Sequence, residues 1–292
     1  MNRIALGTVQ FGQEYGIANS NGMISKDEAF LILDFAKQNG VDTIDTAILY
    51  GESEKKLGEL GVNDFNIISK LPPVPEMTNN LVAWVFNQLE NSLYDLRVPS
   101  IEGLLIHHAK QLTEKNSSEL FNALLKLKEI GLVNKIGVSV YDPLEIEFII
   151  NNFDIDIIQL PFNILDQRII ESNLLHKLEQ KKIEVHVRSV FLQGLLLMEP
   201  EARPEKFCRW NETVWDQYDK WIKDNNVSRL QACLNYVLSF PAVSKIVVGV
   251  DSHTQLKEIL KTATMNMNGE TSQIRFNSND MLLINPSRWK EL

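Results

Sequence analysis

The stretch of residues 101–140 reads IEGLLIHHAKQLTEKNSSELFNALLKLKEIGLVNKIGVSV and contains a complete strand-helix-strand unit. Residues 101–107 and residues 135–140 are short apolar runs, and each predicts a strand. Between them, apolar residues recur at helical spacing over residues 117–130, and Gly131 is suited to end that helix. Two short apolar strands joined by a helix are typical of a parallel sheet with crossover helices.

The same alternation continues through almost the whole chain. Helices are predicted over residues 25–40, 52–60 and 78–95, and the sequence SKDE at Ser25–Glu28 predicts a capping box at the first of them. Six further strands are predicted at residues 3–10, 41–45, 65–70, 156–160, 183–188 and 244–249. Eight such units in 292 residues predict an α/β protein built as one closed (β/α)8 TIM barrel, with residues 1–292 as a single domain. An open doubly wound sheet is the alternative, but the chain lacks both G-x-G-x-x-G after its first strand and G-x-x-x-x-G-K-[ST].

Two segments are expected to extend the barrel. Residues 189–227 form a long βα-loop insertion that contains three tryptophans and could act as a lid. From about residue 263 the chain becomes a polar C-terminal tail, which closes on a short apolar segment ending at Trp289.

Composition indicates a soluble protein with a small-molecule partner. The formal charge of −9 and a pI near 5.2 give no electrostatic footprint for nucleic acid, and no apolar run is long enough to cross a membrane. The start of the chain lacks the features of a signal peptide, and Cys208 and Cys233 suggest two separate thiols rather than a disulfide framework. The cytoplasm is the expected location, and no pattern indicates an oligomeric state.

Chemically active side chains fall at the ends of three successive predicted strands. Asp45, Lys70 and His107 end strands two, three and four, and Tyr50 lies in the loop after strand two. Each residue alone has an ordinary structural explanation, such as a turn cap, a solvated charge, a core histidine or a packing aromatic. In a barrel, however, the C-terminal ends of the strands meet around one mouth, so these four side chains are expected to converge.

The four residues also make chemical sense together. A buried Lys70 paired with Asp45 is expected to lower the pKa of Tyr50, so that Tyr50 can act as a general acid toward a carbonyl oxygen that His107 orients. No side chain supplies a hydride, so such a reduction needs a cofactor. A lyase or isomerase that uses Lys70 as a Schiff base is an alternative, although it leaves Tyr50 and His107 without clear roles.

Residues Asp45, Tyr50, Lys70 and His107, in the contexts IDTAILYGESE, IISKLP and LLIHHA, resemble the Asp, Tyr, Lys, His tetrad of the aldo-keto reductases. These are single-domain (β/α)8 barrels that use a nicotinamide cofactor, and the resemblance extends from about residue 4 to about residue 262. It implies an NAD(P)H-dependent enzyme that reduces an aldehyde or ketone. A cofactor-sensing regulatory protein with little turnover is the alternative function.

The resemblance also implies a set of cofactor contacts: Ser139, Gln159, Arg188, Ser189, Gly249, Asp251, Ser252 and Gln255. Ser139 and Gln159 match the contacts to the nicotinamide carboxamide. Arg188 stands where many members stack a tyrosine on the nicotinamide, and an arginine plane can also stack. Asp251 would repel a 2′-phosphate while Lys257 or Lys261 could compensate, so NADP(H) and NAD(H) both remain open.

Substrate contacts are expected from the loop after the first strand, at Phe11, Tyr15 and Asn19. The sequence GTVQFG…YGIAN is similar to that of bacterial members associated with sugar and surface-polysaccharide metabolism, which implies a keto-sugar or sugar derivative as the substrate. No metal site is expected, because neighbouring His107 and His108 should point to opposite faces of a strand and no H-E-x-x-H or cysteine cluster is present.

Overall fold

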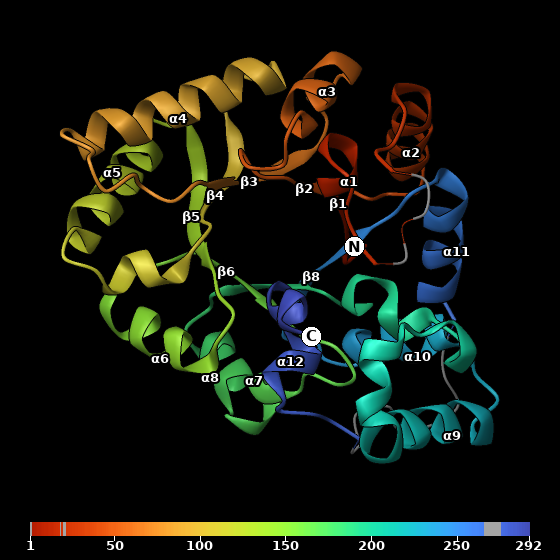
Figure 1. Ribbon diagram of the computed structural model, residues 1–292. Helices are drawn as coiled ribbons and strands as arrows, with labels where there is room; N and C mark the ends of the chain where they lie inside the picture. The colour runs from red at the N-terminus through yellow and green to blue at the C-terminus, as the bar shows by residue number, and fades with distance from the viewer. Residues whose placement is uncertain (1, 18, 20–21, 266–275) are drawn as a thin grey trace.

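The computed structural model describes residues 2–17, 19, 22–265 and 276–292, and its strands form a closed barrel (Figure 1). Neighbouring strands are parallel and follow chain order, and β8 pairs with β1 to close the ring. The strands are β1 Ile4–Gly7, β2 Thr43–Asp45, β3 Asn66–Leu71, β4 Ile101–Ile106, β5 Val133–Ser139, β6 Ile157–Pro161, β7 Glu184–Arg188 and β8 Val243–Gly249. The predicted (β/α)8 fold is therefore confirmed.

The helices surround the ring of strands, as Figure 1 shows. The α-helices are α1 Val9–Gly12, α2 Lys26–Gln38, α3 Ser53–Leu60, α4 Leu81–Leu96, α5 Ser117–Glu129, α6 Pro143–Asn152, α7 Arg168–Glu171, α8 Leu174–Gln180, α9 Asp216–Asp224, α10 Arg229–Leu238, α11 His253–Ala263 and α12 Met281–Ile284. Short 3₁₀ segments are η1 Ala109–Thr113, η2 Leu192–Leu197, η3 Pro200–Ala202, η4 Glu205–Trp210 and η7 Pro286–Glu291, and η5 Asn211–Trp215 is a π-helical turn.

Two predicted boundaries differ from the structure by three residues, and one predicted cap was wrong. The strand predicted over residues 3–10 stops at Gly7, because the chain turns into α1 at Val9. Helix α4 begins three residues later than predicted, because the Asn80 side chain accepts a hydrogen bond from the Ala83 N–H and caps it. At α2 the Ser25 side chain caps the helix, but the Glu28 carboxylate accepts from His253 instead, so the capping box is incomplete.

The interior of the barrel is filled by a small apolar cluster that is separate from the outer core. We call this cluster, made of Ile68, Leu105 and Ile157, the barrel floor. A Cβ atom at Gly103 would lie 2.8 Å from the Ile68 Cδ1, and one at Gly137 would lie 2.0 Å from the Ile157 carbonyl oxygen. Glycine at these two positions therefore lets the floor close beneath the mouth of the barrel.

Part of the long insertion after β7 packs against the C-terminal segment. The Trp289 ring lies 4.9 Å from the Phe207 ring, and Trp210 Nε1 donates to Asp280 Oδ2. Trp210 and Trp215 are buried, so these tryptophans serve packing rather than covering the mouth. Only the first part of the insertion, at and around η2, lines the central cavity.

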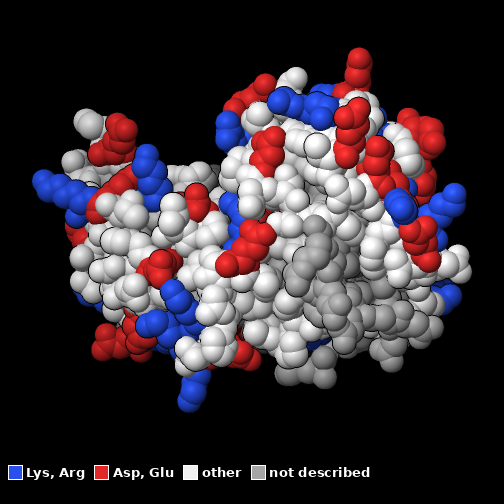
Figure 2. Space-filling model, turned by 90° about the horizontal axis from the view of Figure 1, so that it is seen from below, with Lys and Arg blue, Asp and Glu red and all other residues white. Residues whose placement is uncertain are grey.

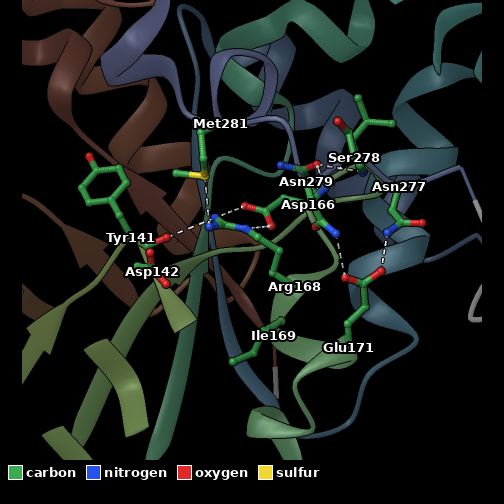
Figure 3. A network of polar contacts seen from close by, with 12 residues as sticks. Tyr141, Asp142, Asp166, Arg168, Ile169, Glu171, Asn277, Ser278, Asn279 and Met281 are labelled. Carbon is green, nitrogen blue, oxygen red and sulfur yellow. Dashed lines mark hydrogen bonds and ion pairs between the residues drawn. The ribbon is translucent and has the colours of Figure 1, made fainter. Parts of the chain in front are cut away.

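The C-terminal segment is also anchored to the loop after β6 and to α7 (Figure 3). Arg168 ion-pairs with the buried Asp166 and contacts Met281 Sδ, while Glu171 accepts from Asn277 and Asn279. The predicted tail is therefore docked over its described residues 276–292.

The molecular surface mixes charges of both signs. On the face drawn in Figure 2, lysine and arginine side chains alternate with aspartates and glutamates, and the described atoms show no large patch of one sign. Within the described ranges, no helix is both long enough and apolar enough to span a membrane. Cys208 is exposed and Cys233 is buried, and both are free thiols, as predicted.

Candidate active site

A cavity of about 400 Å³ opens at the C-terminal ends of the strands, above the barrel floor. Lys70, His107 and Gln159 each follow one of the three floor residues by two positions. Because side chains alternate between the two faces of a strand, a residue two positions after an inward-facing one also faces inward. The alternation therefore directs Lys70 and Gln159 into the cavity. His107, the first residue after β4, also lines the cavity, as do Asp45 and Tyr50.

Lys70 and Asp45 form a buried ion pair. Lys70 Nζ lies 2.7 Å from Asp45 Oδ1 and donates to the Thr46 carbonyl at 2.7 Å, and the two side chains are 1% and 5% exposed. Gln159 Nε2 donates to the other carboxylate oxygen of Asp45 at 2.6 Å. Burial lowers the pKa of Lys70, and the charge of Asp45 opposes that shift. The amine is held by two acceptors, which does not favour its use as a free Schiff-base nucleophile.

Tyr50 and His107 lie against this ion pair. Lys70 Nζ is 5.1 Å from the centre of the Tyr50 ring, and the Tyr50 and His107 rings meet edge-on with centroids 5.9 Å apart. Burial raises the pKa of Tyr50, the charge of Asp45 adds to the rise, and Arg188 opposes it. The expectation that Lys70 lowers this pKa is wrong for the protein alone, because Asp45 offsets the ammonium charge and burial dominates.

Burial lowers the pKa of His107 to about 3, and the charge of Lys70 adds to the effect. His107 is therefore neutral near pH 7 and can still donate one N–H.

The rings of His107 and His108 do not point to opposite faces. Strand β4 ends at Ile106, so both histidines follow the strand, and their ring centroids are only 5.5 Å apart. That expectation was wrong because alternation holds only within a strand. The described part of the chain contains no group of three or more histidine, cysteine, aspartate or glutamate side chains placed to hold a metal ion.

Most residues expected to contact a cofactor line the same cavity. They are Ser139, Gln159, Arg188, Ser189, Gly249, Asp251 and Gln255. Ser252 does not line it: its side chain accepts from the Gln255 N–H and caps α11. The cap helps to hold the turn between β8 and α11, where Gly249 and Asp251 lie.

The hydrogen-bond donors and acceptors just above the barrel floor fit a carboxamide. Ser139 and Gln159 are paired in register on adjacent strands, so a hydroxyl and an amide stand side by side. Gln159 Nε2 is used by Asp45, whereas its Oε1 is buried with no hydrogen-bond partner among the described residues. A buried amide oxygen without a donor is costly, and an N–H₂ group of a ligand would satisfy it.

Two of the three predicted substrate contacts line the cavity, and one does not. Tyr15 and Asn19 line the cavity, and the Tyr15 hydroxyl accepts from Gln193 Nε2 at 3.1 Å. Phe11 was wrongly assigned, since it is completely buried in the outer core and does not line the cavity. Residues 9–12 form a helical turn instead of the end of the predicted strand and the start of a loop, and this turn directs Phe11 away from the mouth.

Several lining residues escaped the sequence prediction, among them Gln10, Tyr141, Gln193 and Glu258. Tyr141 lies two positions beyond the end of β5, outside the predicted strand, so strand alternation did not extend to it. Glu258 follows Gln255 by three positions on α11, so helical spacing could have indicated that residue. No sequence signal marked Gln193, which lies in a left-handed turn within η2.

Comparison with known proteins agrees with the barrel fold. The chain is 25% identical over 283 residues to the uncharacterized oxidoreductase YqkF of Bacillus subtilis, covering 90% of this chain and 91% of that protein. Similar solved structures include the holo form of aldo-keto reductase AKR11C1 from Bacillus halodurans, with a TM-score of 0.73, 20% identity, and 90% and 87% of the two chains covered. Another is glycerol dehydrogenase AKR11B4 from Gluconobacter oxydans, with a TM-score of 0.72, 22% identity, and 94% and 90% covered.

A family model decides the assignment, because it spans nearly the whole chain. The model of the aldo/keto reductase family matches residues 3–273. The chain therefore belongs to the aldo/keto reductase family and is, as such, an NAD(P)H-dependent oxidoreductase.

Proposed function

We propose that the protein reduces an aldehyde or ketone to the alcohol, with Tyr50 as the general acid. The observation that carries this proposal is the buried Lys70–Asp45 ion pair, which lies against the Tyr50 ring in the same cavity as His107. Because the pKa of Tyr50 is raised by burial, its phenol keeps the proton that a carbonyl oxygen needs as negative charge develops. His107, neutral because burial lowers its pKa, polarises the same oxygen through an N–H donor.

A nicotinamide cofactor supplies the hydride when it is bound. Ser139 and Gln159 are suited to hold its carboxamide, since the buried Gln159 Oε1 has no partner among the described residues. Gly249, Asp251 and Gln255 line the far part of the cavity and are suited to hold the adenosine half. Ser252 contributes through its cap on α11 rather than as a lining residue.

The charges in the cavity favour NAD(H) over NADP(H). Asp251 and Glu258 line its β8–α11 end, and Asp251 Oδ1 is buried without a partner among the described residues. Lys70 and Arg188 are the described lysine and arginine that line the cavity, and both lie at the ends of other strands. A 2′-phosphate would therefore meet negative charge, whereas a ribose hydroxyl can donate to Asp251. We expect tryptophan-fluorescence titrations to give a dissociation constant for NADH at least about tenfold below that for NADPH.

The substrate end of the cavity is polar and suits a hydroxylated carbonyl compound, including a keto-sugar or sugar derivative. Tyr15, Asn19 and Gln193 all line it, so hydroxyl and amide groups are available as hydrogen-bond partners for sugar hydroxyls.

The Tyr50→Phe variant tests the proposed mechanism. Removing a general acid is expected to lower kcat by about 10²-fold or more, while the NADH affinity from the same fluorescence titration stays close to that of the unaltered protein. Tyr94→Phe is the matched control, because Tyr94 is 82% exposed and does not line the cavity. Equal turnover by the Tyr50→Phe variant would remove Tyr50 from the mechanism, and NADH binding with no turnover of any carbonyl compound by the unaltered protein would favour the sensor function.

A further inference from the structure

A buried hydroxyl group lies directly after the turn that carries Tyr50. Ser53 is the first residue of α3 and is 0% exposed, and its side chain does not line the cavity. The turn is closed by backbone hydrogen bonds from the Tyr50 N–H to the Ala47 carbonyl and from the Ser53 N–H to the Tyr50 carbonyl. Because a buried hydroxyl needs hydrogen-bond partners, the contacts of Ser53 show what this side chain holds together.

The Ser53 hydroxyl joins the ends of two strands. Its Oγ donates to the Thr8 carbonyl at 2.9 Å and lies 3.0 Å from Thr8 Oγ1, directly after β1. It also lies 3.2 Å from Thr46 Oγ1, directly after β2. Thr8 and Thr46 are also completely buried. The hydroxyls of Ser53, Thr8 and Thr46 therefore form one buried group, which we call the hydroxyl cluster.

The two threonines of the hydroxyl cluster also hold the buried ion pair. Thr8 donates from its N–H and from its hydroxyl to the Asp45 carbonyl, at 3.0 and 3.1 Å. The Thr46 carbonyl accepts from the Lys70 ammonium at 2.7 Å. The hydroxyl cluster therefore connects the backbone of Asp45, an acceptor of Lys70 and the turn of Tyr50.

The position of the Tyr50 ring depends on this turn. The ring contacts Lys70 and His107, but no hydrogen bond joins its hydroxyl to another residue within the described ranges. Next to α1 the turn has no room to move, because a Cβ at Gly51 would lie 2.4 Å from the Gly12 carbonyl oxygen. The turn is therefore fixed by α1 and by the hydroxyl cluster, and not by hydrogen bonds of the phenol.

We propose that Ser53 is a positioning residue, whose hydroxyl fixes Tyr50 relative to the buried ion pair. The inference rests on the proposed reductase function, in which Tyr50 has to reach the carbonyl oxygen of the substrate. A general acid transfers its proton only within hydrogen-bond reach, and a displacement of about 1 Å can cost about 10²-fold in rate. Without the Ser53 hydroxyl, the buried Thr46 Oγ1 keeps no partner among the described residues, so the hydroxyl cluster has to rearrange.

Matched serine variants test the proposal. Ser53→Ala removes the hydroxyl and adds no atoms. Ser92→Ala is the control, because Ser92 is 2% exposed and its hydroxyl donates to Glu54 instead of to the hydroxyl cluster. NADH oxidation with glyceraldehyde as the carbonyl compound is measured for each variant. The folded fraction comes from urea unfolding, so that a loss of stability is not counted as a loss of rate.

We expect Ser53→Ala to lower kcat and kcat/KM together by about ten- to hundredfold, because a group that acts in the transition state is misplaced. The NADH dissociation constant from fluorescence titration should change by less than about twofold. Ser92→Ala should lose stability but keep its kcat. An unchanged kcat in Ser53→Ala, an equal loss of kcat in both variants, or a rise in KM alone overturns the proposal.

A pair of threonine variants covers the case in which Ser53→Ala does not fold. Thr46→Val removes the hydroxyl that meets Ser53 and keeps the carbonyl that accepts from Lys70. Thr43→Val is its control, because Thr43 is 2% exposed and its hydroxyl donates to Asp42 at the start of β2. We expect kcat to fall in Thr46→Val and to be retained in Thr43→Val. Equal values of kcat in these two variants also overturn the proposal.

Fluorine NMR of fluorotyrosine-labelled protein reports on the Tyr50 ring without turnover. The chain has six tyrosines, and the Tyr50 resonance is the one missing from Tyr50→Phe. Ser53→Ala and Thr46→Val should shift or broaden this resonance, whereas Ser92→Ala should not, and the resonance of the exposed Tyr94 should stay constant. If no aldehyde is reduced, the reductase proposal fails, and the spectra still decide on Ser53: an unchanged Tyr50 resonance in the folded variants refutes the positioning role.

Discussion

Replacing Lys70 should show how much the buried Lys70–Asp45 ion pair contributes to the free energy of unfolding. In Lys70→Met, Asp45 keeps the hydrogen bond from Gln159 but loses its only ion-pair partner among the described residues, while its side chain stays about 5% exposed. An uncompensated buried charge costs about 3–5 kcal/mol, so the free energy of unfolding should fall by that amount. In Asp45→Asn the Lys70 ammonium keeps two neutral acceptors, the Thr46 carbonyl and the new amide oxygen, but loses its counter-charge, and a loss of similar size is expected.

The double variant Lys70→Met, Asp45→Asn removes both charges, so its cost should be smaller than the sum of the two single costs. A coupling energy of about 2–4 kcal/mol is expected, because the double variant leaves no unpaired charge buried. Urea unfolding at pH 7, followed by the fluorescence of the five tryptophans, measures all three variants.

The exposed pair of Lys128 and Asp156 provides the control. These side chains are 37% and 31% exposed, and Lys128→Met should cost no more than about 1 kcal/mol. If Lys70→Met costs as little as Lys128→Met, or if the double variant is additive, the argument that the active-site pair is a buried, mutually dependent unit is wrong.

Three further outcomes are expected. The pKa of His107 is lowered to about 3 from an ordinary value near 6.5, so the unfolded chain binds this proton more tightly than the folded protein. The free energy of unfolding should therefore be highest above about pH 6.5 and fall as the pH is lowered toward 3. In urea titrations, His107→Asn should lose less stability over this range. In Gly12→Ala, the new Cβ would lie 1.8 Å from the Tyr50 carbonyl oxygen, so both stability and kcat/KM should fall. The control is Gly40→Ala, at φ +72° with open space around it, which should cost only about 1–2 kcal/mol of stability and leave kcat/KM unchanged. Trp289→Ala should cost about 3–5 kcal/mol, because the ring is 4% exposed, and unchanged thermal unfolding would show that the C-terminal segment is not docked as described.

Strand alternation explains why much of the candidate site could be found in the sequence. Apolar runs located the strands, and the step of two residues from Ile68 to Lys70 and from Ile157 to Gln159 carries the inward direction from the barrel floor to the mouth. Phe11 was misplaced because the same reasoning extended the first strand past Gly7, where the backbone already turns into α1.

The sequence by itself determined the barrel and the convergence of Asp45, Tyr50, Lys70 and His107, because apolar periodicity and position at strand ends are local properties of the chain. Only the tertiary structure decided which partner each charged side chain has. Asp45 accepts from Gln159, 114 positions away, and Arg188 stacks on Tyr141 without a carboxylate partner among the described residues. Burial and long-range neighbours set the pKa of Tyr50 against the sequence expectation, because desolvation depends on every group packed around the phenol and not on the chain near it.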